Sequence, residues 1–374
     1  MRGDYIPRIA AATLPRAAFP LAANASHTLS MHRRFVARFT LVAVACTAVL
    51  ACNDGDAAPS PEPDSPNVAS AAPVAADSPA ARPDSAPDTT RATRAPNELG
   101  KIPILEYHLL GETEGRWQRE WTRFRRDLEI LYERGYRPVS VSDLVDGRID
   151  LPAGLSPVVF TFDDASPSQF RYVERPDGSL AIDSTSAVGI WLDFAKSRPD
   201  WKNRATFCLL SGAEAGRSFF GNKGIEGQRT EWRFAKVRFL AEQGFELCNH
   251  TLWHANLGKY DDAFVQEQIA RGVMAIDSAV PGYRVRSLAL PLGVWPKNRE
   301  LAVRGSWRDP KTGRVVAYEF DAVLEVAGYP VPGPAAPGFT PLSLDRVQVY
   351  GDRLEQTLDQ LERHGQRWVS GGRK

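Results

Sequence analysis

From about residue 100 onward, the chain alternates short apolar runs with amphipathic segments. The apolar runs have the length of buried strands, and the amphipathic segments have apolar residues three and four positions apart, as helices do. The predicted strands cover residues 102–108, 137–141, 158–162, 205–210, 245–248 and 287–290, and the predicted helices cover 124–134, 191–196, 232–243, 261–279 and 354–364. Gly135 and Gly244 follow two of the helical segments, where helices commonly end.

Strands that alternate with helices predict a parallel sheet with right-handed crossovers. The repetition of this order through residues 98–374 favours an α/β fold, a distorted or incomplete (β/α) barrel with a mostly parallel sheet. Residues 305–345 are rich in Gly and Pro, and their pattern predicts no particular helix or strand. Catalytic groups of barrel folds lie at the C-terminal ends of the strands, so polar residues that follow the apolar runs are the first candidates for a site.

Residues 1–97 differ in composition from the rest of the chain. Residues 1–30 have no apolar periodicity, and we interpret them as an upstream, unstructured start. Residues 31–52 resemble a bacterial lipoprotein signal peptide, because a basic stretch precedes an apolar run that is too short to span a bilayer and that ends at Cys52. Residues 53–97 consist largely of Pro, Ala, Ser and Asp, and we predict a disordered linker because they can bury little apolar surface.

These features predict a protein of the bacterial cell envelope. A lipid on Cys52 would attach the chain to a membrane, on the periplasmic or outer-surface side, and the linker would hold the domain 98–374 away from it. Cleavage without lipidation and an uncleaved anchor are the alternatives. The formal net charge of +1 gives no electrostatic reason to expect nucleic acid as a partner.

Two adjacent carboxylates, Asp163 and Asp164, follow the apolar run 158–162. Like charges at neighbouring positions repel each other, so a buried pair needs a cation or a shared proton. Adjacent side chains point to opposite faces of a strand, but the strand ends here, and one carboxylate can bind a metal while its neighbour turns toward the metal's water. A polar turn that caps the next helix is the alternative.

His250 and His254 follow the predicted strand 245–248. Two imidazoles four residues apart on a turn of helix can converge on one ion, although this spacing alone is a weak signal. With Asp164 they make a set of two histidines and one carboxylate. Such a set suits zinc or another divalent first-row metal and leaves coordination positions open for water and substrate.

The order and spacing of these motifs resemble the polysaccharide deacetylases with a NodB-type domain, carbohydrate esterase family 4. The resemblance covers about residues 100–300. Residues 161–164 (Thr-Phe-Asp-Asp) resemble the first motif of the family, 250–254 (His-Thr-Leu-Trp-His) the second, and 291–293 (Pro-Leu-Gly) the end of the third. The stretch 241–247 also resembles the sequence before the metal-binding histidines of the family.

The resemblance implies a role for each matching position. Asp163 would be the general base, and Asp164, His250 and His254 would hold one divalent metal ion, with zinc ahead of cobalt or nickel. The backbone N–H of Leu292 would help to bind the oxyanion. A bound divalent ion can lower the pKa of its water from 15.7 to about 7, and Asp163 would take the proton as this water attacks the acetyl carbonyl.

Two positions depart from the family pattern. Ala289 stands where the family usually has an Arg that orients the base, so either another cation, such as the nearby Arg286, replaces it or the pKa of Asp163 is less depressed. The usual late histidine motif is not apparent. His108, at the end of the first predicted strand, resembles the Tyr-His of the branch that acts on poly-N-acetylglucosamine, and we predict that it is the general acid. A packed core histidine is the alternative.

Trp253, Trp295 and Pro291 flank the motifs and are candidates for binding the sugar, because aromatic faces stack well on sugar rings; core packing is the alternative. The leading functional prediction is a metal-dependent hydrolase that cleaves the amide bond of N-acetyl groups on an acetylated, N-acetylglucosamine-containing polysaccharide. One alternative is an esterase that removes O-acetyl groups, as on xylan. Another is a catalytically weak glycan-binding protein.

Overall fold

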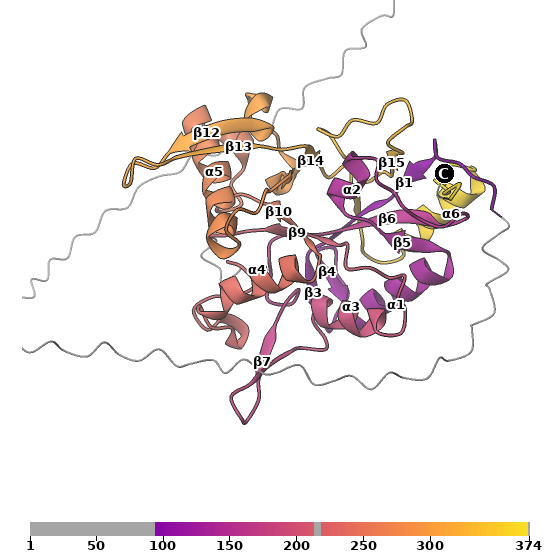
Figure 1. The fold of residues 1–374 in the computed structure, drawn as a ribbon, viewed down its shortest axis with the longest axis horizontal. Helices are drawn as coiled ribbons and strands as arrows, with labels where there is room; N and C mark the ends of the chain where they lie inside the picture. The colour runs from indigo at the N-terminus through magenta and orange to yellow at the C-terminus, as the bar shows by residue number, and fades with distance from the viewer. Residues whose placement is uncertain (1–93, 213–217, 373–374) are drawn as a thin grey trace, which may run out of the picture. The chain divides into compact units, whose positions relative to one another are not determined.

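The computed structural model describes residues 94–212 and 218–372, and Figure 1 shows their fold. The predicted upstream start, the signal peptide and most of the predicted linker lie outside these ranges, so a lipid on Cys52 and an envelope location stay predictions from the sequence. Within the described ranges, no helix combines the length and the apolar character needed to cross a membrane.

A curled sheet of eight parallel strands forms the centre of the fold. The strands are β2 (Ile104–Tyr107), β5 (Tyr136–Pro138), β6 (Ser156–Phe162), β9 (Thr206–Leu209), β10 (Glu246–Asn249), β11 (Ser287–Ala289), β14 (Ala322–Leu324) and β16 (Val347–Gln348). Their order is β14-β11-β10-β9-β6-β2-β16, and β5 pairs with the start of β6. Leu344, just before β16, forms a bridge with Leu324 of β14. The segment that ends the strand order at β16 therefore also touches β14, the strand at the opposite end. The predicted incomplete barrel with a mostly parallel sheet is confirmed.

The described residues contain six α-helices. They are α1 (Trp121–Glu133), α2 (Val141–Val145), α3 (Ala187–Ala195), α4 (Trp232–Glu242), α5 (Asp262–Ala279) and α6 (Arg353–Arg363). The predicted strand 137–141 is too long, because Val141 already begins α2. The cause is a capping box, in which the Ser140 side chain accepts a hydrogen bond from the N–H of Asp143 and the Asp143 side chain accepts one from the N–H of Ser140.

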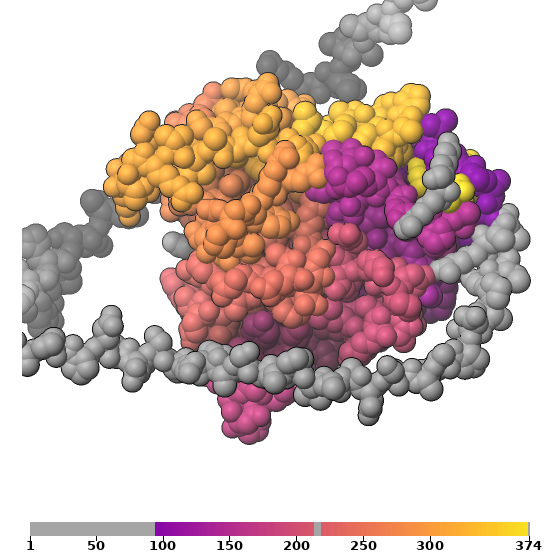
Figure 2. All heavy atoms as spheres, viewed as in Figure 1, coloured from indigo at the N-terminus to yellow at the C-terminus, as the bar shows by residue number. Residues whose placement is uncertain are grey.

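Short strands outside the central sheet pair with one another. The antiparallel pairs are β1 (Lys101–Ile102) with β15 (Val331–Pro332), β7 (Tyr172–Glu174) with β8 (Leu180–Ile182), and β12 (Arg304–Arg308) with β13 (Val315–Glu319); β3 (Leu109–Gly111) pairs with β4 (Gln118–Glu120) in parallel. The hairpin β12–β13, orange in Figures 1 and 2, packs on α5. It begins the stretch 305–345, for which the sequence predicted little.

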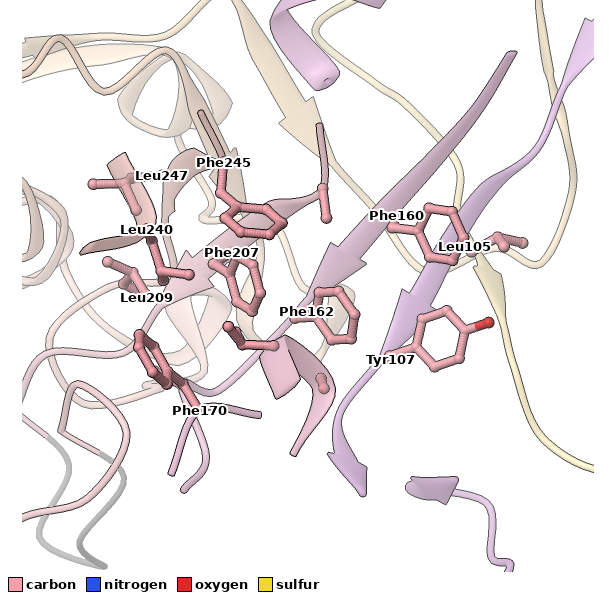
Figure 3. Packing of buried hydrophobic residues seen from close by; sticks show 14 of the residues in the cluster. Leu105, Tyr107, Phe160, Phe162, Phe170, Phe207, Leu209, Leu240, Phe245 and Leu247 are labelled. Carbon is pink, nitrogen blue, oxygen red and sulfur yellow. The ribbon is translucent and has the colours of Figure 1, made fainter. Parts of the chain in front are cut away.

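A row of buried aromatic rings packs beneath the C-terminal ends of β2, β6 and β9, next to the candidate site. All seven residues of β6 are buried, which explains its continuous apolar run, because a central parallel strand is covered on both faces. Phe162 stacks on Phe207 of β9 at 4.8 Å and on Tyr107 of β2 at 5.5 Å between ring centroids (Figure 3). This packing fixes the ends of three neighbouring strands relative to one another.

Candidate active site

Asp163 and Asp164 leave the C-terminal end of β6 in different backbone conformations. The N–H of Asp163 donates to the carbonyl of Tyr107 at 2.9 Å, so Asp163 continues the pairing with β2. Asp164 has a φ of 77°, in the left-handed region that few residues other than Gly adopt. This turn ends the strand and leaves both carboxylates near His250, whose Nε2 lies 3.9 Å from Asp163 Oδ2 and 3.5 Å from Asp164 Oδ1.

His250 and His254 lie in the loop after β10. The N–H of His250 donates to the carbonyl of Leu209 at 3.0 Å and extends the pairing with β9. Thr251 and His254 have φ values of 68° and 57°, and the two imidazole centroids are 4.9 Å apart. The predicted turn of helix is wrong, because residues 250–256 form no helix. The imidazoles converge through left-handed loop residues instead.

Asp164, His250 and His254 have the arrangement of a metal site. Nε2 of His250 and Nε2 of His254 lie 3.5 Å and 3.6 Å from Oδ1 of Asp164, and all three candidate ligand atoms lie within 4.8 Å of one another. Nδ1 of His250 is hydrogen-bonded to the carbonyl of Ala289 at 2.9 Å, an interaction that presents Nε2 as the ligand atom. This Nε2 is buried and has no hydrogen-bond partner among the described residues. The set therefore fits one divalent ion.

Two of the three candidate ligands, His254 and Asp164, are already deprotonated at pH 7. Burial lowers the pKa of His250, but the Asp163 and Asp164 carboxylates outweigh it and raise the pKa to about 9. Burial and the neighbouring His250 lower the pKa of His254 to about 4, so this imidazole is neutral at pH 7. Burial opposes ionisation of Asp164, but its interactions with His250 hold the pKa at about 2. A cation that binds here would have to displace a proton only from His250.

Arg346, which immediately precedes β16, supplies the cation beside Asp163. Its side chain is fully buried, and its Nη1 and Nη2 donate to Oδ1 and Oδ2 of Asp163 at 2.7 Å and 2.8 Å. Nη2 also lies 2.9 Å from Oε1 of Glu106. Arg286 instead pairs with two carboxylates that are not part of this group. Arg346 therefore places next to Asp163 the positive charge that Ala289 cannot supply.

This ion pair keeps Asp163 in its carboxylate form. Burial by itself raises the pKa of Asp163, but Arg346 and then His250 outweigh it and hold the pKa well below its usual range. The two parallel hydrogen bonds from one guanidinium also fix the orientation of the carboxylate. Asp163 is therefore an ionised carboxylate of fixed orientation beside a candidate metal site.

Glu106 and His108 lie on the other side of Asp163. His108 Nε2 is 3.9 Å from Oε1 of Glu106, and one ligand atom from each of Glu106, His108 and Asp163 lies within 4.8 Å of the others. We assign no metal to this group, because the guanidinium of Arg346 already supplies its positive charge. The side-chain amide of Gln169 donates to the carbonyls of His108 and Asp163, at 2.6 Å and 2.5 Å. Gln169 thus ties together the backbones of the predicted acid and the predicted base.

A cleft of about 660 Å³ opens over these side chains. It is lined by Glu106, His108, Leu109, Arg116, Trp117, Asp163, Asp164, His250, His254, Leu290, Leu292 and Val326. The predicted base, metal ligands and acid therefore lie together in one cleft. Leu292 is 62% exposed on its wall and has a φ of 59°. Pro291, predicted to bind substrate, is buried and is not part of the lining.

The two predicted tryptophans are likewise not part of the lining. The indole N–H of Trp295 donates to Oε1 of Glu325 at 2.9 Å, and a guanidinium stacks on its ring. Trp253 packs against Phe264 of α5. The tryptophan that lines the cleft is Trp117, which belongs to none of the motifs.

The sequence analysis missed Arg346, Glu106 and Trp117. A carboxylate inside the apolar run 104–107 was a usable signal for Glu106, because buried acids nearly always have a partner. Arg346 and Trp117 have no comparable local signal, since their roles depend on which strands and loops lie beside them.

Comparison with known proteins gives a partial match. A family model described as polysaccharide deacetylase matches residues 200–304, a segment that contains His250 and His254 and begins after Asp163 and Asp164. A chitooligosaccharide deacetylase from Bradyrhizobium sp. (strain ANU 289) is 31% identical over 62 residues, which is 17% of this chain and 28% of that protein. The chain thus spans little more than a quarter of the length of this curated relative.

Several solved structures have a distantly similar fold. A polysaccharide deacetylase from Bacillus anthracis is 16% identical, with a TM-score of 0.48 over 69% of this chain and 68% of the other. The deacetylase PplD from Streptococcus pyogenes, solved with acetate, is also 16% identical, with a TM-score of 0.48 over 70% and 99%. IcaB from Ammonifex degensii is 20% identical, with a TM-score of 0.45 over 69% and 95%.

Proposed function

We propose that this chain is a member of the polysaccharide deacetylase family, whose model matches residues 200–304, and that it is a metal-dependent hydrolase of acetylated polysaccharides. Its substrate would be a glycan that contains N-acetylglucosamine, and the bond cleaved would be the amide of the N-acetyl group. The observation that carries this proposal is the pairing of Arg346 with Asp163 directly beside the Asp164, His250 and His254 set.

The cofactor would be one divalent ion held by Asp164, His250 and His254, with zinc ahead of cobalt or nickel because two imidazoles and a carboxylate suit it. When bound, such an ion supplies Lewis acidity and a water of lowered pKa. The ligand set uses only three side chains, so positions remain open for water and for a substrate oxygen.

The remaining chemistry belongs to side chains of the cleft. Asp163, held ionised by Arg346, would accept a proton at a carboxylate oxygen. The backbone N–H of Leu292, on the exposed wall of the cleft, would donate to the developing oxyanion. His108 would donate a proton to the leaving nitrogen. Burial lowers the pKa of His108, although Asp163 and Asp164 oppose it, so the imidazolium gives up its proton more readily than that of a free histidine.

The alternative function, removal of O-acetyl groups, differs in its need for this acid. An amine leaves poorly as an anion and must be protonated, whereas an alkoxide leaves more readily. His108 lines the cleft, and its Nε2 lies 3.9 Å from Oε1 of Glu106. A ring nitrogen of His108 also lies within 4.8 Å of a carboxylate oxygen of Asp163. This position of a candidate acid favours cleavage of the N-acetyl amide over removal of O-acetyl groups.

The test of the proposed function is release of acetate with and without metal. Protein stripped by a chelator is expected to release none from β-1,6- or β-1,4-linked N-acetylglucosamine oligomers, and added zinc, cobalt or nickel to restore release, because the three-residue ligand set then holds a cation. Metal content should be measured on the same samples. Release that continues in metal-free protein would contradict the metal dependence. No release from these oligomers or from acetylxylan with any metal would overturn the function.

Removing the predicted acid should affect the two kinds of acetyl group differently. His108→Ala is expected to lower kcat on an N-acetylglucosamine oligomer by about 10²-fold or more, the usual contribution of a positioned general acid, and to lower O-acetyl ester hydrolysis far less. The matched control is His364→Ala, since His364 is exposed at the end of α6. Equal losses on amide and ester would show that His108 supports the site without acting as the acid.

A further inference from the structure

We propose that Trp117 is the platform on which a sugar ring of the substrate stacks inside the cleft. The inference rests on the proposed function, because it assigns the part of the substrate that lies beside the acetyl group. None of the motifs includes Trp117, and it stands just before β4, far in sequence from the metal ligands.

The backbone places Trp117 next to the predicted acid. Its carbonyl accepts a hydrogen bond of 3.0 Å from the N–H of Leu109, the residue that follows His108. The indole ring meets the His108 imidazole nearly edge-on, with centroids 4.8 Å apart and an interplanar angle of 74°. A ring stacked on Trp117 would therefore lie close to the imidazole that has to reach the leaving nitrogen.

The indole is held in place but still open to the cleft. The guanidinium carbon of Arg116 lies 5.1 Å from its ring centroid, and Arg116 Nε donates to Oε1 of Gln348 in β16 at 3.3 Å. Trp117 nevertheless remains 48% exposed and lines the cleft. A fixed aromatic face loses little conformational entropy when a ligand covers it, so its stacking energy goes largely into binding.

The surroundings indicate a sugar ring. Leu292 and Val326, which are 62% and 38% exposed, give the lining further apolar surface, while carboxylates and Arg116 supply polar contacts. A pyranose combines a flat apolar C–H face with a polar rim, and aromatic rings of amphipathic character bind such ligands well. Rings whose substituents are all equatorial, as in β-linked N-acetylglucosamine, leave this face free and should be preferred.

The test compares a glycan with a small ester that has no sugar ring. Trp117→Ala is expected to lower kcat/KM on an N-acetylglucosamine oligomer about tenfold, equivalent to about 1.4 kcal/mol, mainly through KM. The kcat/KM of Trp117→Ala for 4-nitrophenyl acetate should stay within about twofold of the wild-type value. Trp117→Phe keeps an aromatic face and should retain most of the glycan activity. Calorimetric binding of the oligomer, measured in an Asp163→Asn background, should weaken with Trp117→Ala.

Tyr260→Ala is the matched control, because Tyr260 is 44% exposed and stacks on Phe264 outside the cleft lining; it should change neither activity. Unchanged kcat/KM of Trp117→Ala on the oligomer would overturn the proposal. A loss on the oligomer that lies in kcat, with its KM and its calorimetric binding unchanged, would also overturn it, since Trp117 would then only support His108. Equal losses on the oligomer and the small ester would overturn it as well, since they would mean that Trp117 only stabilises the site as a whole. Both results require an active wild type, whereas a wild type that releases no acetate from any glycan overturns the proposed function itself.

Discussion

Asp163→Asn is expected to lower kcat for acetate release by about 10³-fold, within the range that a positioned general base contributes. The amide cannot accept the proton that Asp163 is held ready to take by Arg346. Its shape is nearly unchanged, and Asp164, His250 and His254, the proposed metal ligands, are left in place. The measurement is steady-state kinetics on an N-acetylglucosamine oligomer, with bound zinc quantified on the same protein.

The neighbouring carboxylate is the control that separates base from ligand. Asp164→Asn should lose bound zinc together with activity, whereas Asp163→Asn should lose activity and keep the metal. If Asp163→Asn instead kept its kcat, the assignment of the base would be wrong. If the wild type were inactive and both it and Asp163→Asn bound the glycan, the chain would be a glycan-binding protein rather than an enzyme.

Arg346→Met is expected to destabilise the fold by about 3–5 kcal/mol, the usual cost of removing one partner from a buried ion pair. Arg346 is fully buried and interacts with two buried carboxylates, Asp163 and Glu106. Removing it takes away the guanidinium that both acids contact and leaves Asp163 with only the weaker attraction of His250. Urea unfolding of metal-free wild type and variant measures the difference.

The same variant should change the pH dependence in a defined direction. In the wild type the pKa of Asp163 is depressed, so its ionisation stabilises the fold above the unfolded pKa, which is about 3.9, and this contribution is lost only as the pH falls through the lower folded value. Without Arg346, burial is opposed mainly by His250, so the pKa of Asp163 rises from its depressed value. The variant should then lack part of the stability that ionised Asp163 gives the wild type, so the difference in unfolding free energy between the two should be largest above about pH 4 and should shrink at lower pH. The acid limb of the kcat/KM–pH profile should move to higher pH because the base is protonated over a wider pH range.

Arg137→Met is the matched control for this prediction. Arg137 is also a buried arginine, and it pairs with Asp200 at 2.8 Å, outside the cleft lining. It should cost stability but leave the acid limb of the activity profile in place. Arg346→Lys keeps a positive charge without the two parallel hydrogen bonds, so it should recover part of the pH profile. An Arg346→Met protein with the wild-type pH profile would contradict the orienting role.

The strands and helices of the barrel were largely predictable because their residues carry the pattern locally. The run 158–162 corresponds to β6, and the segment 261–279 corresponds to α5, whose N-cap is Asp261. Prediction was poorest after residue 305, where β14 and β16 have three and two residues. Strands this short have too few positions for a recognisable period, and their pairing depends on partners that are distant in sequence.

The sequence by itself determined the two ends of the site. Asp163 and Asp164 follow one buried strand, and His250 and His254 follow another. Because parallel strands end on the same side of a sheet, these four residues predicted a metal site. The order and spacing of the motifs carried the family resemblance, and the alternation of strands with helices predicted the barrel. Which carboxylate was the base came only from the resemblance, and the helical turn predicted for the histidines was wrong because the loop uses left-handed residues instead.

Only the tertiary structure decided what surrounds Asp163. Arg346 comes from the far end of the chain and reaches Asp163 because β16 pairs with β2, which lies beside β6. Glu106, Gln169 and Trp117 likewise act through contacts between separate segments. A side chain that orients, neutralises or covers a reacting group can come from any part of the chain that folds beside it. Because burying a charge is costly, a partner for Asp163 could be expected, but its position in the sequence could not be predicted.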